Sequence, residues 1–194
     1  MRALHQSVLS NPLAMPARYR TVRCSKQQWS IMGIELVELG SEFIPRCAAL
    51  MMAANPWDKL YFTTAQCEES LASPGMRIHG LLADGELLGF LSSLAAGLGG
   101  EPLIEYLCVA DGHRSQGLGT RLINFFEEEL FPDADNVYLF VSDINPAAIR
   151  LYVRLGYQQV GAFPNFNLEA QTEFLHRKSR RPRQAANRAA LQSA

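Results

Sequence analysis

The most constraining feature of this chain is an eight-residue stretch, HRSQGLGT, at residues 113–120. It follows an apolar run from Leu103 to Ala110 and precedes apolar residues that recur at helical spacing, so it predicts a strand, a glycine-rich turn and a helix. The first N–H groups of a helix have no acceptor within it, and the helix dipole adds positive potential there. The stretch therefore predicts a binding site for an anion, most often a phosphate.

Two common types of phosphate-binding turn do not fit this stretch. A P-loop requires Gly-x-x-x-x-Gly-Lys-Ser/Thr, and no lysine follows Gly117 or Gly119. A dinucleotide-binding turn requires a third glycine where this chain has Leu122. The remaining pattern is V-x-x-x-x-R-x-x-G-x-G, which starts at Val109 and includes Arg114. An ordinary strand-to-helix turn, with glycine for close packing, is the alternative interpretation.

A second informative stretch, NPAAIRLYVRLGY, runs from Asn145 to Tyr157. Asn145 is a favourable N-cap, Pro146 suits the first turn of a helix, and Gly156 is a typical helix stop. These signals predict a short helix. Its apolar face carries Ala148, Leu151, Tyr152 and Leu155.

Together, the two stretches resemble the signature segments of the GNAT superfamily of N-acetyltransferases. The first is similar to the coenzyme-A-binding motif, Arg/Gln-x-x-Gly-x-Gly/Ala after a strand that ends in Val, and the second to the segment Asn-x-x-Ala-Ile-x-Leu-Tyr-x-x-x-Gly-Tyr. The resemblance covers about residues 34–178 and is nearest the branch around the ribosomal-protein alanine N-acetyltransferases. It implies an enzyme that transfers an acetyl group from acetyl-CoA to a primary amine by direct attack in a ternary complex.

The order of the expected elements predicts an α/β (α+β) fold. The resemblance implies a twisted mixed sheet of about seven strands with four flanking helices, whose fourth and fifth strands splay apart around acetyl-CoA. We expect an N-acetyltransferase domain at residues 31–178, a flexible extension at 1–30 and a disordered basic tail at 179–194. The expected strands are residues 34–39, 76–83, 86–94, 103–110, 136–142, 157–162 and 172–176, and the expected helices begin near residues 41, 64, 118 and 146.

The resemblance also implies which residues hold the coenzyme. Backbone groups of Leu107, Cys108 and Val109 would bind the pantetheine arm. Asn145 would contact the coenzyme near the splayed strands, a role compatible with its function as an N-cap. The pyrophosphate would lie on the turn, where glycine lets the backbone approach closely: Arg114, Ser115, Gln116, Gly117, Leu118, Gly119 and Thr120.

The resemblance assigns Tyr152 as the general acid that protonates the departing thiolate, since a phenol remains protonated at neutral pH. Its alternative role is that of a core aromatic. Glu105 is the one charged residue in an otherwise apolar strand, which makes it either the candidate general base or a solvent-facing residue at a strand edge. The N-terminal acetyltransferase branch usually has a glutamate where this chain has Phe140, so the base and the acceptor stay open. The N–H of Val109 is a candidate oxyanion donor.

The acceptor site is expected among residues 55–58, the loop 97–102 and the loop 163–168, and the acceptor is the amine of a small molecule or a protein. A non-catalytic acyl-CoA sensor with the same fold is the competing function, and it would tolerate Tyr152→Phe. The two ends of the chain, before Glu35 and after Glu173, carry eleven of the 18 basic residues. They lack the interleaved aromatics of a base-stacking surface, so we do not expect a nucleic-acid partner.

The four cysteines form no C-x-x-C pair and show no metal-ligand spacing with the four histidines. We therefore expect no metal, and free, mostly buried thiols in a reducing cytoplasm. No apolar run approaches the roughly 20 residues of a membrane span, so we expect no membrane association. The sequence is compatible with a homodimer but does not specify one.

Overall fold

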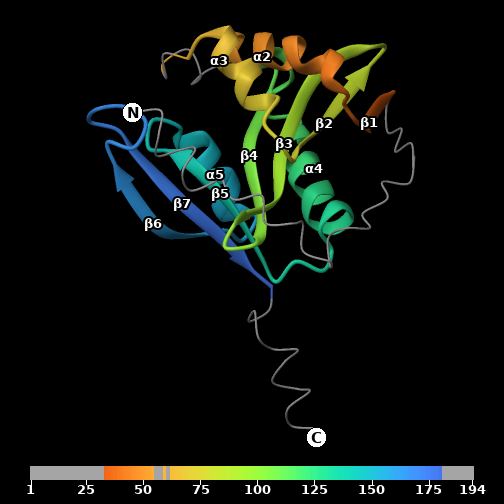
Figure 1. Ribbon diagram of the computed structural model, residues 1–194. Helices are drawn as coiled ribbons and strands as arrows, with labels where there is room; N and C mark the ends of the chain where they lie inside the picture. The colour runs from red at the N-terminus through yellow and green to blue at the C-terminus, as the bar shows by residue number, and fades with distance from the viewer. Residues whose placement is uncertain (1–32, 55–58, 60–61, 181–194) are drawn as a thin grey trace, which may run out of the picture.

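The computed structural model describes residues 33–54, 59 and 62–180, and it contains the expected mixed sheet (Figure 1). The strand order is β1-β2-β3-β4-β5-β7-β6. Every neighbouring pair is antiparallel except β4 and β5, which run parallel. The predicted fold is confirmed. The strands are β1 (Ile34–Glu38), β2 (Met76–Ala83), β3 (Glu86–Leu98), β4 (Glu101–Val109), β5 (Asn136–Ser142), β6 (Gln158–Pro164) and β7 (Thr172–Ser179).

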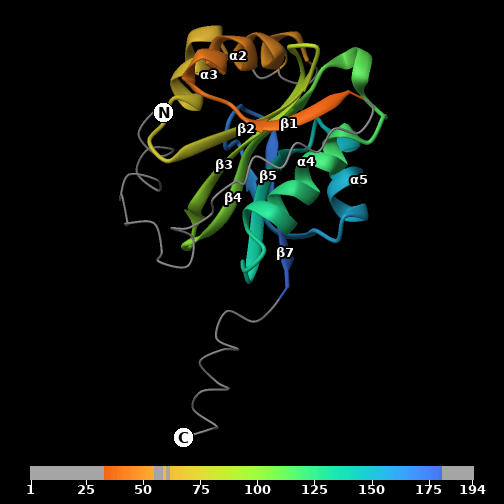
Figure 2. The ribbon, with the colours of Figure 1, turned by 90° about the vertical axis from the view of Figure 1, so that its right-hand side faces the viewer.

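Helices cover both faces of this sheet, as Figures 1 and 2 show. On one face, α2 and α3 pack over a core that includes Cys47, Phe90 and Cys108. On the other face, α4 and α5 pack over a second core that includes Leu122 and Tyr157. The helices are α2 (Ile44–Ala53), α3 (Thr64–Leu71), α4 (Leu118–Phe125) and α5 (Pro146–Arg154), with short turns η2 (Ser41–Phe43), η4 (Asp111–His113) and the π-helical η5 (Phe126–Leu130).

One boundary differs from that expected. The loop predicted at 97–102 is mostly strand, because Gly99 and Gly100 adopt φ of 60° and 78° and reverse the chain within two residues. The cap of α3 is Thr63, whose side chain accepts from the backbone N–H of Gln66 in a capping box.

The described domain ends later than expected. Strand β7 continues to Ser179, and the backbone N–H of Arg180 donates to the carbonyl of Asp135 at 2.8 Å. The expected extension at 1–30 and the rest of the expected tail, 181–194, lie outside the described residues. Among the residues that are described, no helix has the length and apolar character needed to cross a membrane.

A β-bulge in β4 determines the shape of the sheet. Ser92 pairs with Tyr106 and Ser93 pairs with Ile104, so Glu105 is an extra residue of β4 at a shift in the strand register. A bulge of this kind bends its strand and redirects the extra side chain, and bulges are common next to active sites.

The same place marks the end of pairing between β4 and β5. The paired residues are Leu103 with Tyr138 and Ile104 with Leu139, and no pair follows the bulge. The two strands therefore diverge toward their carboxyl ends, which is the splay expected from the sequence.

A buried glutamate ties the end of α4 to β7. Glu127, in η5, is only 3% exposed, and its Oε2 accepts from Lys178 Nζ at 2.5 Å. Arg180 lies 3.6 Å from the same oxygen and also donates to the backbone carbonyl of Glu127 at 2.6 Å. The carboxylate thus lies between two cations and connects elements more than 40 residues apart.

We predict that Glu127→Gln lowers the free energy of unfolding by roughly 2 kcal/mol, because a buried charge-assisted contact is lost. Urea denaturation measures this change. The exposed neighbour Glu128 supplies the control, and Glu128→Gln should shift the free energy by less than about 0.5 kcal/mol. Equal effects of the two substitutions would mean that the contact contributes nothing.

Candidate functional site

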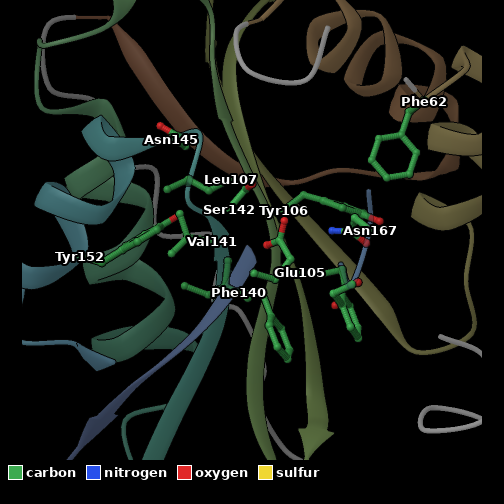
Figure 3. A pocket seen from close by; sticks show the side chains of 13 residues that line it. Phe62, Glu105, Tyr106, Leu107, Phe140, Val141, Ser142, Asn145, Tyr152 and Asn167 are labelled. Atoms are coloured by element: carbon green, nitrogen blue, oxygen red, sulfur yellow. The ribbon is translucent and has the colours of Figure 1, made fainter. Parts of the chain in front are cut away.

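A cavity of about 130 Å³ opens where β4 and β5 diverge (Figure 3). Typical pockets for whole ligands are several times larger, so this one can enclose only the reacting end of a long molecule. Its walls come from both strands, from α5 and from the segment between β6 and β7. The lining includes Glu105, Tyr106 and Leu107 of β4, Phe140, Val141 and Ser142 of β5, Asn145, Tyr152, Phe166, Asn167 and Glu173.

The backbone of β4 presents hydrogen-bonding groups to this gap. The N–H of Ala110 donates to Leu88 on β3 at 2.9 Å. Backbone groups alternate sides along a strand, so Cys108 also faces β3, whereas Leu107 and Val109 face the side from which β5 has diverged. Of the three residues predicted for the pantetheine arm, two therefore have their backbone directed toward the gap. The Cys108 thiol is turned away from the gap, 3.7 Å from the carbonyl of Leu50.

The glycine-rich stretch forms the predicted turn at the start of α4. Gly117 has φ of 83° and Ser115 has φ of 61°, so the backbone passes twice through the left-handed region. The N–H of Arg121 makes the first helical bond, to the carbonyl of Gly117 at 2.9 Å. The helix geometry thus leaves the N–H groups of Leu118, Gly119 and Thr120 without an intrahelical acceptor.

Arg114 lies at the same turn and is held near the end of β4. Its Nε donates to the carbonyl of Val109 at 3.3 Å, and its guanidinium lies 2.9 Å from Asp111 Oδ1. The two side chains of this ion pair are 40% and 60% exposed, so water weakens it and the arginine can turn toward an anion at little cost. Gln116 binds back to the Gly112 carbonyl at 3.2 Å.

The two sequence motifs lie on the same face of the sheet, where α4 and α5 pack against a shared core that includes Leu122 and Tyr152. A Cβ added at Gly119 would lie 3.5 Å from Leu151, an ordinary packing distance, so the space at this point does not by itself require glycine. Asn145 caps α5 as expected, because its Oδ1 accepts from the N–H of Ala148 at 3.1 Å. Asn145 also lines the pocket.

Tyr152 extends from α5 toward the gap, as Figure 3 shows. It is only 6% exposed, and its ring contacts those of Tyr157 and His176 at centroid distances of 5.9 and 6.5 Å. Burial raises the pKa of the Tyr152 phenol above its ordinary value, so the group stays protonated at neutral and moderately alkaline pH. The Tyr152 side chain is thus part of the hydrophobic core and also lines the pocket.

Two carboxylates line the pocket, and the sequence pointed to only one. Glu105, the bulge residue, is half-buried and directed into the gap rather than facing solvent at an edge. Glu173 on β7 is 5% exposed and stands opposite Ser142 of β5 in the strand register. Its alternation with Phe174 resembled that of an ordinary half-exposed strand, so its burial depends on strand pairing that has no local sequence signal.

Of the three segments expected to bind the acceptor, one lies outside the described residues, one does not line the pocket and one does. Residues 55–58 lie outside the described part of the chain. Residues 97–102 belong to the β3–β4 hairpin and do not line the pocket. The segment 163–168 does contribute, because Phe166 stacks on Phe140 at a centroid distance of 6.0 Å and Phe163 contacts both rings at 5.8 Å.

The family model for the acetyltransferase (GNAT) family matches residues 43–157, more than half of the chain. The chain belongs to this family, and it is an acetyl-CoA-dependent N-acetyltransferase with acetyl-CoA as co-substrate. Among curated proteins it is 31% identical over 118 residues to the N-alpha-acetyltransferase RimI of Mycobacterium tuberculosis, an alignment that covers 59% of this chain and 69% of that protein. The expected relation to the ribosomal-protein alanine N-acetyltransferase branch is thus confirmed.

Solved structures share the fold at lower identity. The ribosomal-protein-S18-alanine N-acetyltransferase of Escherichia coli superposes with a TM-score of 0.64 at 18% identity, over 77% of this chain and 95% of that one. An aminoglycoside 6′-N-acetyltransferase complexed with coenzyme A gives 0.61 at 20% identity, over 76% and 98%.

The described cysteines are free and buried, and the described residues contain no cluster of three metal-ligating side chains. Burial raises the pKa of both Cys47 and Cys108 to about 12 and also raises that of Cys67. Because the thiolate is the reactive form, these thiols should be nearly inert in the native protein.

We predict that a variant with both Cys24→Ser and Cys67→Ser, which keeps Cys47 and Cys108, reacts with a thiol-specific chromogenic reagent at pH 8 roughly a thousand-fold more slowly when native than when denatured, since a pKa near 12 leaves so little thiolate. Two equivalents should react in denaturant. Fast reaction of the native protein would show that the sheet core opens readily.

Proposed function

We propose that this protein transfers the acetyl group of acetyl-CoA to a primary amine of a small molecule or a protein, by direct attack within a ternary complex. The observation that carries the proposal is the gap between β4 and β5, with Tyr152 on one wall and Glu105 on the other. The M. tuberculosis relative favours the N-terminal amine of a protein as the first acceptor to test. The free thiols of Cys47, Cys67 and Cys108 support a reducing setting such as the cytoplasm.

In this proposal the coenzyme binds along the gap. Its pyrophosphate lies on the turn of residues 114–120, where helix N–H groups and Arg114 supply positive potential. The pantetheine arm follows β4 and binds the backbone of Leu107 and Val109, while the Asn145 amide supports it from the other side. Cys108 was also expected to bind the pantetheine arm, but it has no part in this proposal because its backbone groups face β3.

The chemistry assigns one task to each group. The neutral amine nitrogen attacks the thioester carbonyl and forms a tetrahedral oxyanion, which the N–H of Val109 stabilises. The carbon–sulfur bond then breaks, and Tyr152 donates its proton to the thiolate. The amine loses one proton to Glu105, directly or through water. The products are an amide and free coenzyme A, and the protons balance when the tyrosinate recovers one from the glutamic acid or from water.

We predict that acetyl-CoA and free CoA each raise the melting temperature of the protein by several degrees, and that Gly117→Trp abolishes the shift by filling the turn. Gly85→Trp is the matched control, because Gly85 has φ of 79° against 83° for Gly117 and neither has an atom within 4 Å of an added Cβ. The backbone strain is therefore equal in both variants. A full shift in Gly117→Trp would contradict the coenzyme site.

We predict that Tyr152→Phe lowers kcat about a hundred-fold or more while the thermal shift with CoA stays the same, because only the proton donor is lost. Release of CoA thiol measures the rate. Tyr157→Phe, which removes a buried phenol from the ring in contact with Tyr152, serves as control and should keep most of kcat. Retained activity in Tyr152→Phe would assign the acid role to another group, and wild-type protein that binds CoA without turnover of any amine would favour the sensor.

A further inference from the structure

The pocket contains a second buried carboxylate that the proposed chemistry does not use. Glu173 lines the pocket from β7, across from the bulge residue Glu105. We propose that Glu173 binds the acceptor as an ammonium cation, so that the acceptor enters charged and is held by the carboxylates of the pocket before it releases one proton to water and becomes the neutral amine that attacks. This inference rests on the proposed function in that it takes the pocket to be the place where the amine binds.

The contrast between two buried glutamates carries the argument. Glu127 is 3% exposed and lies against Lys178 and Arg180. Glu173 is 5% exposed, yet none of the ion pairs among the described residues includes it. Buried charges in proteins are paired, because removal from water is costly. The missing positive charge at Glu173 is therefore one that a ligand brings.

A polar neighbour supports the same conclusion. Ser142, opposite Glu173 in the register, is 6% exposed and lines the pocket. Its hydroxyl and the side chain of Asn167 act on the Glu173 carboxylate as hydrogen-bond donors and oppose the rise in its pKa. Both donors are neutral, so they leave the negative charge for a ligand that brings a positive one and donates several N–H bonds, as an ammonium does.

The rest of the pocket indicates an organic cation. Phe140 and Phe166 stack at the wall, and Tyr106 and Phe62 also line the cavity. Aromatic faces attract ammonium groups and accommodate the methylene groups attached to them. The small cavity admits a primary ammonium on a slender stem better than a branched or quaternary one.

Glu173 should make binding depend on pH. Burial raises the pKa of Glu173 above its ordinary value, and the charge of Asp143 adds to the increase against the opposing influence of nearby polar side chains. The carboxylate therefore forms at higher pH than usual, and affinity for an ammonium should rise with pH as Glu173 ionises. The other titratable groups that line the pocket are Glu105, Tyr106 and Tyr152, and Asp143 acts on Glu173 through its charge. Burial raises the pKa of Tyr106 to about 12 and raises that of Tyr152, so both tyrosines stay neutral.

Calorimetry on the full-length protein saturated with free CoA tests the proposal, because no transfer can occur and only binding is measured. The probes are 1,4-diaminobutane, 2-phenylethylamine and a peptide with N-terminal alanine, which distinguish small amines from a protein terminus. We expect the wild type to bind at least one of them, Glu173→Gln to bind it at least ten-fold more weakly, and the pH dependence to weaken in that variant. Glu169→Gln, exposed in the same segment, should match the wild type.

The stability of the variant separates binding from structure. A glutamine has the same shape and no charge to bury, so Glu173→Gln should keep or raise the melting temperature, unlike the paired Glu127. Glu173→Asp, which keeps the charge on a shorter stem, should bind the probe with intermediate affinity.

Equal affinity of the wild type and Glu173→Gln, or no binding of any amine to the wild type, would overturn the ammonium site. If the wild type binds an amine probe as expected but transfers no acetyl group to it, the proposed chemistry is wrong and the ammonium site stands. If the wild type transfers the acetyl group but Glu173→Gln binds the amine with unchanged affinity, only the ammonium site is wrong.

Discussion

The structure of this protein depends on one β-bulge in the middle of its sheet. The bulge at Glu105 ends the pairing of β4 with β5 after two residue pairs, and everything in the candidate site follows from that separation. Without the extra residue, the two strands could continue their ladder and the backbone groups of Leu107 and Val109 would bind β5. The bulge also turns the Glu105 side chain into the gap. One irregularity thus creates a space, its hydrogen-bonding wall and a carboxylate.

The gap is flanked by two helices that share one core with the sheet. Each helix follows one of the two diverging strands, and Leu118, Leu122 and Tyr152 belong to the same hydrophobic cluster. This shared core places the start of α4 and the Asn145 cap of α5 on the same face of the sheet. The two sequence motifs therefore belong to one part of the fold, which explains why each alone is a weaker signal than the pair.

The features predictable from the sequence are those with local causes. Gly117 and Gly156 need left-handed backbone, and Asn145 needs only its own helix, so their roles follow from neighbouring residues. The bulge and the burial of Glu173 arise from registers between strands, which no local pattern specifies. For the same reason, Cys108 was assigned with its neighbours although alternation turns its backbone away. Sequence reasoning thus named Glu105, Leu107, Asn145 and Tyr152, which line the pocket, and missed Glu173, which lines it as well.

The two ends of the gap carry groups of opposite charge. The turn at residues 114–120 presents helix N–H groups and Arg114, while Glu105 and Glu173 lie deeper, on β4 and β7. From Val109 back to Glu105 the strand spans about 13 Å, so the positive and negative ends are separate sites rather than one mixed cluster. This separation of charge allows one orientation: a polyanionic cofactor with an extended arm places its phosphates at the turn, and a cationic acceptor binds near the carboxylates. The same separation keeps the carboxylates from repelling the phosphates, so both substrates can occupy the gap together, as direct attack requires.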